Sequence, residues 1–310
     1  MDWVSLTTGY DKIGYIGHSQ GNGLAFLALS QGFCPGLGER LSCFIALAPA
    51  VYAGPLTTGF PFTALNKMDW DHWKRVFGVL DFIPVMTWAY NYAPTSMFST
   101  MGYTMFAFLF EWTDTNWYIH SLYTRDSSLF ANRRERRLKR RKNKMFRFTP
   151  TPVSSAGIFW WCGKGGFADR QCIMDTSMPA WFDERFPPLS IYYGGRDYLV
   201  LADPLFERLK EKEKAVKVIR TKLIEDSEHC DFYWAADAVE WLFEDLVGKF
   251  VLEWQCRIGY KTDALCAFAD DIEMTRPRAE GEPPYQPRSR RHSQANGYTD
   301  SPTSVKLVDV

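Results

Sequence analysis

The sequence lacks the cysteine patterns of metal-binding and disulfide-stabilised proteins. Its seven cysteines are odd in number, widely scattered, and include no Cys-x-x-Cys pair with the spacing of zinc ligands. We therefore expect free thiols in a reducing compartment and no bound metal. Net charge is lacking too, because 36 basic and 36 acidic side chains cancel. No long-range field therefore draws the whole chain to nucleic acid or to an anionic membrane.

The N-terminus has no basic segment followed by an apolar stretch, so the sequence predicts no cleavable secretory signal and an intracellular protein. Charge is also missing from residues 82–110, a length that could span a bilayer. Pro84 and Pro94 interrupt this stretch, and proline breaks a regular helix. Two interpretations stay open: a transmembrane span, or helices whose apolar face contacts substrate or lies in a lipid surface.

The early part of the chain alternates strand and helix patterns around a glycine-rich turn. Residues 12–16 are mostly apolar, with β-branched and aromatic side chains, and run into Gly17-His18-Ser19-Gln20-Gly21. Residues 22–30 are rich in Leu and Ala, which favour a helix. Residues 41–50 are almost continuously apolar, as expected for a strand buried on both faces of a parallel sheet.

A second group of strand and helix patterns comes late in the chain. Strands are predicted at 189–193 and 216–224, with a helix around 205–214 between them and an amphipathic helix at 237–250 after them. The two groups predict an α/β fold with a mostly parallel sheet that is split in sequence. The residues between the groups lack this alternation and are unusually aromatic, which indicates an inserted helical cap. The predicted organisation is a first core part at 1–59, a cap at 60–184, a second core part at 185–266 and a disordered tail at 267–310.

Ten cations stand against one acid between residues 133 and 147. Such a run repels itself and is expected to be exposed. It could bind anionic lipid near a membrane surface, serve as a nuclear-type or nucleic-acid-binding segment, or form a solvated loop. The sequence leaves these three interpretations open.

The turn at residues 17–21 has the Gly-x-Ser-x-Gly pattern of a nucleophile elbow. In such an elbow the serine sits on a strained turn between a strand and a helix, and the flanking glycines leave room for the crowded backbone. A serine hydroxyl is a poor nucleophile at neutral pH, so it needs a histidine base that a carboxylate orients. We therefore predict an α/β-hydrolase with Ser19 as nucleophile and the backbone N–H of Gln20 as a donor to the oxyanion.

Elimination among the five histidines selects the base, because the chain order in this fold is serine, acid, histidine. His72 and His120 precede every plausible late acid, and His292 lies in the predicted tail. His18 is inside the elbow and would point away from its neighbour. His229 remains, in a loop directly after the predicted strand at 216–224.

Several acids could orient this histidine. Asp197 follows the predicted strand at 189–193 through two glycines, which places it at a strand's carboxyl end, where α/β sites are built. Asp203 is the runner-up because it lies a few residues further on. Asp226 and Asp231 are expected to shape the histidine loop or to cap the next helix.

A second oxyanion donor should come from the loop after an earlier strand. Few residues precede the first predicted strand, so the first strands of a hydrolase sheet are expected to be missing and the chain to be incomplete. Losing one oxyanion donor typically lowers the rate by about a hundredfold to a thousandfold.

These motifs resemble the acid lipase group of α/β-hydrolases, which includes gastric and lysosomal lipases and fungal triglyceride lipases and cholesterol esterases. The similar core segments are the elbow at 12–21, the strand end at 46–50, the acid strand at 187–197 and the histidine loop at 228–232. The fungal branch fits best, through residues 106–114 and 152–167 of the cap.

The resemblance implies that Ser19, Asp197 and His229 form a triad, with Gln20 as an oxyanion donor, and that no metal or organic cofactor is needed. It implies hydrolysis of a steryl ester or acylglycerol through an acyl-enzyme, at a lipid droplet or membrane surface. The alternative is a truncated relative that binds lipid or a membrane without hydrolysing an ester. Nucleic-acid binding by the basic run is a third interpretation. Between these alternatives, we expect a lipid ester substrate and no nucleic-acid partner.

Overall fold

The computed structural model describes residues 1–80, 90–113, 116, 144, 146 and 153–246. The chain divides into two compact units, Met1–Asp245 and Leu246–Val310, and the helices and strands named below all lie in the first. The predicted tail at 267–310 falls outside the described residues, as does the basic run at 133–147 apart from Lys144 and Phe146.

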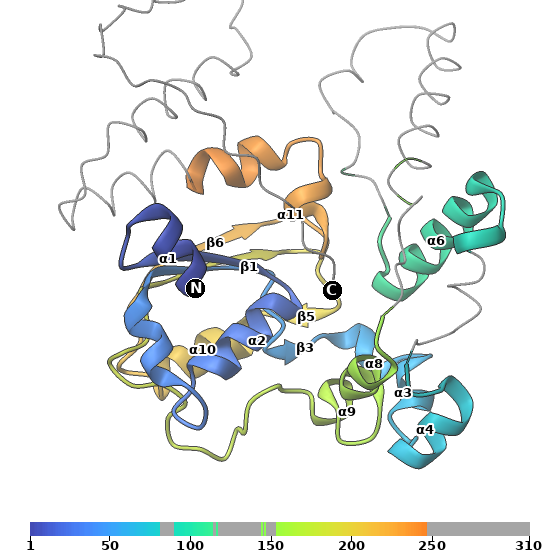
Figure 1. Ribbon diagram of the computed structural model, residues 1–310, viewed down its shortest axis with the longest axis horizontal. Coiled ribbons are helices and arrows are strands. Elements are labelled where there is room, and N and C mark those ends of the chain that lie inside the picture. Colours follow the sequence, from blue (N-terminus) through green and yellow to red (C-terminus); the bar gives the residue numbers. More distant parts are fainter. Residues whose placement is uncertain (81–89, 114–115, 117–143, 145, 147–152, 247–310) are drawn as a thin grey trace, which may run out of the picture. The chain divides into compact units, whose positions relative to one another are not determined.

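A four-stranded parallel sheet forms the centre of the first unit, with the strand order β1-β2-β4-β6 (Figure 1). These strands are β1 (Ile13–His18), β2 (Leu41–Leu47), β4 (Leu189–Gly194) and β6 (Val218–Ile224). A separate antiparallel pair joins β3 (Tyr52–Ala53) to β5 (Val200–Leu201). The predicted parallel sheet is confirmed, and it is split in sequence because β2 pairs directly with β4 across the long intervening segment.

The two inner strands carry the core of this sheet. Phe44, Ile45 and Ala46 of β2 are at most 1% exposed, as the continuously apolar sequence of this strand predicts. Strand β1 pairs only with β2 among the described residues, and its Ile16 is 56% exposed. Strand β1 is therefore an edge of the described sheet, and the elbow begins where this edge strand ends.

Helices flank both faces of the sheet. Figure 1 shows α2 and α10 on one side and α11 with the π-helical turn that follows it on the other. The bounds are α1 Asp2–Thr8, α2 Gln20–Leu29, α10 Asp203–Glu211, α11 Asp231–Trp234, the π-helical turn Val239–Phe243, and the 3-10 turns Pro35–Arg40 and Pro55–Thr58. The amphipathic helix predicted at 237–250 is described only in its first part, where the structure has the π-helical turn.

Between β3 and β4 the described residues form helices that gather at one end of the sheet (Figure 1). These helices, with the described residues just after α6, are called the cap below. They are α3 (Phe62–Leu65), α4 (Trp70–Phe77), α6 (Thr95–Phe110), α8 (Ser155–Cys162) and α9 (Phe167–Arg170). The buried indole of Trp73 donates to the Ser155 hydroxyl at 3.0 Å, which joins α4 to α8. Helix α6 takes up the second half of the uncharged stretch at 82–110. Of the helices in the described part of the chain, none is both long enough and apolar enough to cross a membrane.

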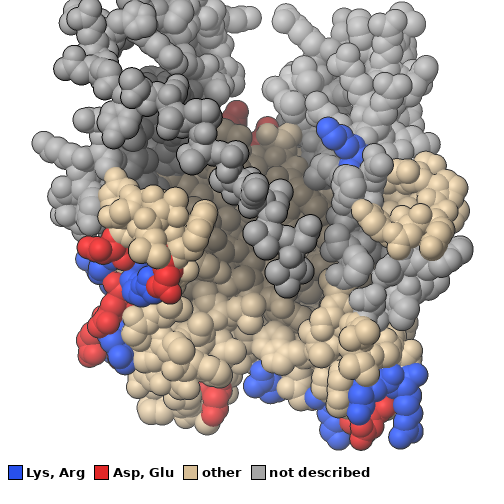
Figure 2. Space-filling model, viewed as in Figure 1, with Lys and Arg blue, Asp and Glu red and all other residues tan. Residues whose placement is uncertain are grey.

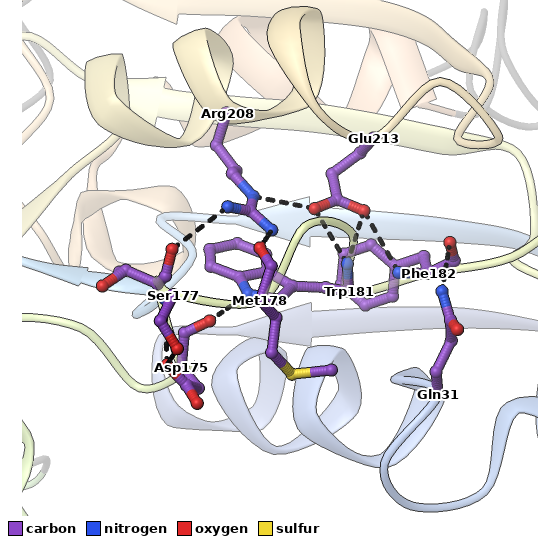
Figure 3. Close-up of polar contacts among 9 residues, drawn as sticks. Gln31, Asp175, Ser177, Met178, Trp181, Phe182, Arg208 and Glu213 are labelled. Carbon is purple, nitrogen blue, oxygen red and sulfur yellow. Dashed lines mark hydrogen bonds and ion pairs between the residues drawn. The ribbon is translucent and has the colours of Figure 1, made fainter.

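A buried ion pair fastens the segment that leads from α9 back to β4 (Figure 3). Arg208 on α10 donates to Glu213 at 2.8 Å, and the side chains are only 5% and 0% exposed. Glu213 also accepts from the backbone N–H groups of Trp181 and Phe182, while the Arg208 guanidinium lies 4.1 Å from the centre of the Trp181 ring. Both buried charges thus have the partners that burial demands.

Candidate active site

The elbow holds Ser19 in a backbone conformation that few side-chain-bearing residues adopt. Ser19 lies between β1 and α2 with φ 51° and ψ −116°. Its backbone N–H donates to the Leu47 carbonyl of β2 at 3.0 Å, and its own carbonyl accepts from Asn22 and Gly23 of α2. The sheet and the helix together thereby maintain a strained turn, as expected for an exposed nucleophile.

The glycines around this turn do not all serve the same purpose. A Cβ atom on Gly17 would lie 2.3 Å from Asn22 Oδ1, and one on Gly23 would lie 2.7 Å from the Ala50 carbonyl oxygen. A Cβ on Gly21 would be no closer than 3.6 Å to the Tyr15 hydroxyl, which is an ordinary contact. Gly17 therefore makes room for the Asn22 side chain, and Gly23 lets α2 approach the backbone at Ala50.

The structure brings Ser19, His229 and Asp197 into one continuous chain of hydrogen bonds. His229 Nε2 lies 2.7 Å from Ser19 Oγ, and His229 Nδ1 lies 2.7 Å from Asp197 Oδ2. In the tautomer that this order requires, Nδ1–H donates to the carboxylate and Nε2 accepts from the serine hydroxyl. The three residues follow β1, β4 and β6, so the carboxyl ends of three parallel strands assemble the site.

The Asp197 carboxylate is fixed by backbone donors as well as by the histidine. Its Oδ1 accepts from the N–H groups of Leu199 at 3.0 Å and Val200 at 3.1 Å, which leaves Oδ2 facing His229. The two glycines before it let the histidine loop approach, since a Cβ on Gly194 or Gly195 would lie 2.3 Å from a carbonyl oxygen of that loop. The glycine pair therefore sets the distance between the acid loop and the histidine loop.

The other acids considered from the sequence lie elsewhere. Asp203 is the first residue of α10, and the carboxylate on His229 is that of Asp197. Asp226 forms an ion pair with Arg196 at 2.7 Å. Asp231 begins α11, is fully buried, and accepts from the backbone N–H of Glu228 at 2.9 Å, so it shapes the histidine loop.

His18 contacts the backbone of His229, and this contact was not expected from the sequence. Its Nε2–H donates to the backbone carbonyl of His229 at 2.7 Å, and the two ring centres are 5.0 Å apart. Burial, together with the positive charge that His229 can carry, lowers the pKa of His18 to about 4, so this imidazole is neutral at pH 7. Nothing in the sequence signals the contact, because residues 18 and 229 meet only when β1 and β6 join one sheet.

An apolar cavity of about 290 Å³ opens beside Ser19 and Gln20. Its wall is built mainly from α3, α6, α8 and α9, through side chains that include Phe62, Leu109, Phe110, Trp161 and Phe167. Ser19, Gln20 and Thr57 are the polar residues among those that line it. The site can therefore hold a long apolar group next to the Ser19 side chain.

The described residues show no cluster of three or more His, Cys, Asp or Glu side chains that could hold a metal ion. The five described cysteines, Cys34, Cys43, Cys162, Cys172 and Cys230, are free thiols.

A parallel sheet whose strand ends join a serine on a strained elbow to a histidine and an aspartate defines the α/β-hydrolase class. Comparison with curated proteins finds relatives that are named as esterases and lipases. Over 289 residues it is 28% identical to sterol esterase 2 of Saccharomyces cerevisiae, covering 82% of this chain and 49% of the esterase. Over 256 residues it is 26% identical to human gastric triacylglycerol lipase, covering 80% of this chain and 60% of the lipase. The chain is thus a relative of the sterol esterases and acid lipases, as its motifs indicate, and spans 49% to 60% of the length of these two proteins.

No protein-family model matches the chain. Among solved structures, an α/β-hydrolase fold protein from Chitinophaga pinensis is similar with a TM-score of 0.37 and 13% identity, covering 80% of this chain and 69% of that one. The strand order and the elbow geometry define the fold, and this likeness adds nothing to that definition.

Proposed function

We propose that the chain is a serine hydrolase of lipid esters, with Ser19 as nucleophile, His229 as general base and Asp197 as the acid that orients it. One observation carries the proposal: the hydrogen-bonded chain from Asp197 through His229 to Ser19 ends at the wall of an apolar cavity. The names of the two relatives, a sterol esterase and a triacylglycerol lipase, support the same class of reaction.

The proposed reaction runs in two halves. Ser19 Oγ attacks the ester carbonyl while His229 Nε2 takes the hydroxyl proton, and the Gln20 backbone N–H donates to the oxyanion that forms. His229 then gives the proton to the departing alcohol oxygen, which leaves the acyl group on Ser19. Water, deprotonated by the same imidazole, attacks this acyl-enzyme. His229 then returns the proton to Ser19 Oγ as the acyl C–O bond breaks, which releases the fatty acid and restores the serine hydroxyl. Asp197 stabilises the imidazolium in both halves, and no step needs a cofactor.

The cavity favours a substrate with a long apolar part. Its wall is almost entirely apolar, so the acyl chain or sterol ring would replace water there. Each methylene group buried in this way contributes about 0.8 kcal/mol to binding. A steryl ester or a triacylglycerol satisfies this requirement, whereas a small polar ester would gain little from the cavity.

We further propose that the protein works inside the cell at the surface of a lipid droplet or membrane. Helix α6, whose last residues line the cavity, exposes apolar side chains, with Met97 56% and Phe108 59% exposed. On the face drawn in Figure 2, charged side chains of both signs gather at the left and at the lower right, with a mostly tan surface and a few single charges between the two groups. Exposed apolar groups of this kind can enter the boundary layer of a lipid surface.

The experiment that tests the proposal is fatty acid release from emulsified triacylglycerol and steryl ester, measured for the wild type and Ser19→Ala. We expect release by the wild type and none above background by the variant. A fluorophosphonate probe separates the rival function, because an enzyme is labelled at Ser19. A folded wild-type chain that binds lipid emulsion but is neither labelled nor active would instead be a lipid-binding relative.

A further inference from the structure

The loop that carries His229 is held from the cap as well as from the sheet. Two carboxylates flank the histidine in this loop, and both are buried, with Glu228 5% and Asp231 0% exposed. Burial raises the pKa of both carboxyl groups, which expresses the cost of keeping charge away from water. Such groups persist in a fold where hydrogen-bond donors offset that cost.

The donors come from the short segment that follows α6. The backbone N–H of Thr113 donates to Glu228 Oε2 at 2.9 Å, and the Thr113 hydroxyl donates to Oε1 of the same carboxylate. The Trp112 indole donates to Asp231 Oδ1 at 3.2 Å, and the Asn116 amide donates to Oδ2 at 2.7 Å. Each oxygen of both carboxylates therefore accepts at least one bond from the segment 112–116.

Backbone contacts extend this attachment to both ends of the loop. Asn116 Nδ2 also donates to the Asp226 carbonyl at 2.5 Å, at the start of the loop. The backbone N–H of Ala236, just after α11, donates to the Asn116 carbonyl at 2.8 Å. Asn116 thus contacts the stretch that contains His229 near both of its ends.

The same part of the cap touches the base and the substrate cavity. Phe110, the last residue of α6, lines the cavity, and its ring lies nearly parallel to the His229 imidazole, at 9° and 6.2 Å between centres. Phe110, in the cavity wall, therefore contacts the imidazole, and Trp112, Thr113 and Asn116, which follow it closely in sequence, hold the loop that carries this imidazole.

We propose that Glu228 and Asp231 are positioning residues that fasten the histidine loop to the segment 112–116, so that the His229 imidazole stays between Asp197 and Ser19. This inference rests on the proposed function, since it concerns the geometry of the proposed base. A displacement of about 1 Å in a reacting group can lower the rate about a hundredfold. Neither carboxylate is among the described residues that line the cavity, so the loss falls on kcat and leaves KM unchanged.

Asp231→Asn is the sharpest variant. Both Asp231 oxygens accept from N–H donors, so an asparagine must turn its NH₂ group toward at least one of them. With p-nitrophenyl butyrate as substrate we expect kcat to fall about a hundredfold, with KM within about twofold of the wild type. Asp226→Asn is the matched control, because the Asp226 carboxylate is in the same loop but exposed and paired with Arg196, and its kcat should equal that of the wild type.

A milder pair keeps the test decisive if Asp231→Asn does not fold. Thr113→Val removes the hydroxyl donor to Glu228, keeps the backbone donor and barely changes the volume. We expect kcat to fall about tenfold, as loss of one hydrogen bond to a buried charge predicts, and Thr113→Ser to restore it. Equal kcat for Thr113→Val and the wild type would overturn the inference.

A readout without turnover separates this inference from the proposed function. The Nδ1 proton that His229 shares with Asp197 should give a downfield proton resonance, identified by its loss in His229→Gln. We expect this resonance in the wild type and in Asp226→Asn, and its loss or broadening in Asp231→Asn. A wild type that hydrolyses no ester but shows this pattern would refute the function and support the positioning role. A folded Asp231→Asn that keeps both the resonance and kcat would overturn the positioning role.

Discussion

The sheet and the cap both reach His229, but through different kinds of contact. The sheet places Ser19, Asp197 and His229 at the carboxyl ends of β1, β4 and β6, where strand pairing and close backbone approach at glycines fix the distances. The cap contributes side chains and one backbone N–H from the segment 112–116, together with the Phe110 ring. The loops that follow three strands thus carry Ser19, Asp197 and His229, while residues just after α6 also hold the loop of His229.

The largest effect should come from the acid that the sheet supplies. Asp197→Asn removes the carboxylate that holds the histidine tautomer, and kcat should fall about 10⁴-fold. Asp203→Asn is the matched control, because this nearby acid begins α10 and should leave kcat unchanged. Kinetics of both variants with one soluble ester decide the matter, and equal losses would contradict the assignment of the acid.

The Arg208–Glu213 ion pair holds the segment between α9 and β4, so its loss should lower the free energy of unfolding without a direct effect on the reaction rate. Glu213→Gln leaves Arg208 buried without its partner charge, which should lower the free energy of unfolding by about 3 to 5 kcal/mol. Urea unfolding of the variant and the wild type measures this difference. Asp183→Asn breaks the more exposed pair with Arg185 and should change little. A similar small effect for Glu213→Gln would show that the pair in Figure 3 does not hold the segment.

His18, the β1 residue that donates to the His229 carbonyl, should make the stability of the protein depend on pH. His18 has an ordinary pKa of 6.5 and a folded pKa of about 4, so between these values the unfolded chain binds more protons than the folded one. Stability should therefore fall as pH drops from 6.5 to 4, by about 3 kcal/mol in total. The titratable groups that face this ring are His229, Asp197 and Tyr233. In His18→Gln this part of the loss should disappear, and unfolding experiments at pH 7 and pH 4 would measure it.

The smallest effect concerns the preference for long over short acyl chains in the substrate. Leu109 lines the cavity from α6, and Leu109→Trp should reduce the space for an acyl chain. We expect kcat/KM for p-nitrophenyl palmitate to fall about tenfold relative to p-nitrophenyl acetate, since overpacking a filled site typically costs about 1 to 3 kcal/mol. Phe108→Trp, on the exposed side of the same helix, should leave the ratio unchanged. No change in Leu109→Trp would place the acyl chain elsewhere.

The features of the sheet could largely be predicted from the sequence because they are local. The apolar run of β2, the glycine-rich turn after β1 and the Gly194-Gly195 pair before Asp197 each carry their own signal within a few residues. The contacts of the cap carry none. Trp112, Thr113 and Asn116 meet Glu228 and Asp231 across more than a hundred residues, and donors of this kind occur throughout the chain. The exact domain limits at 59, 184 and 266 stay predictions.

The most direct test of the central claim is capture of the acyl-enzyme. The folded chain is mixed with excess p-nitrophenyl ester, quenched in acid after a short time, and examined by intact mass and peptide mapping. We expect one acyl group for each active chain, on the peptide that contains Ser19, and no adduct in Ser19→Ala. Ester hydrolysis by the folded wild type without any adduct at Ser19, or with the acyl group on another residue, would contradict it.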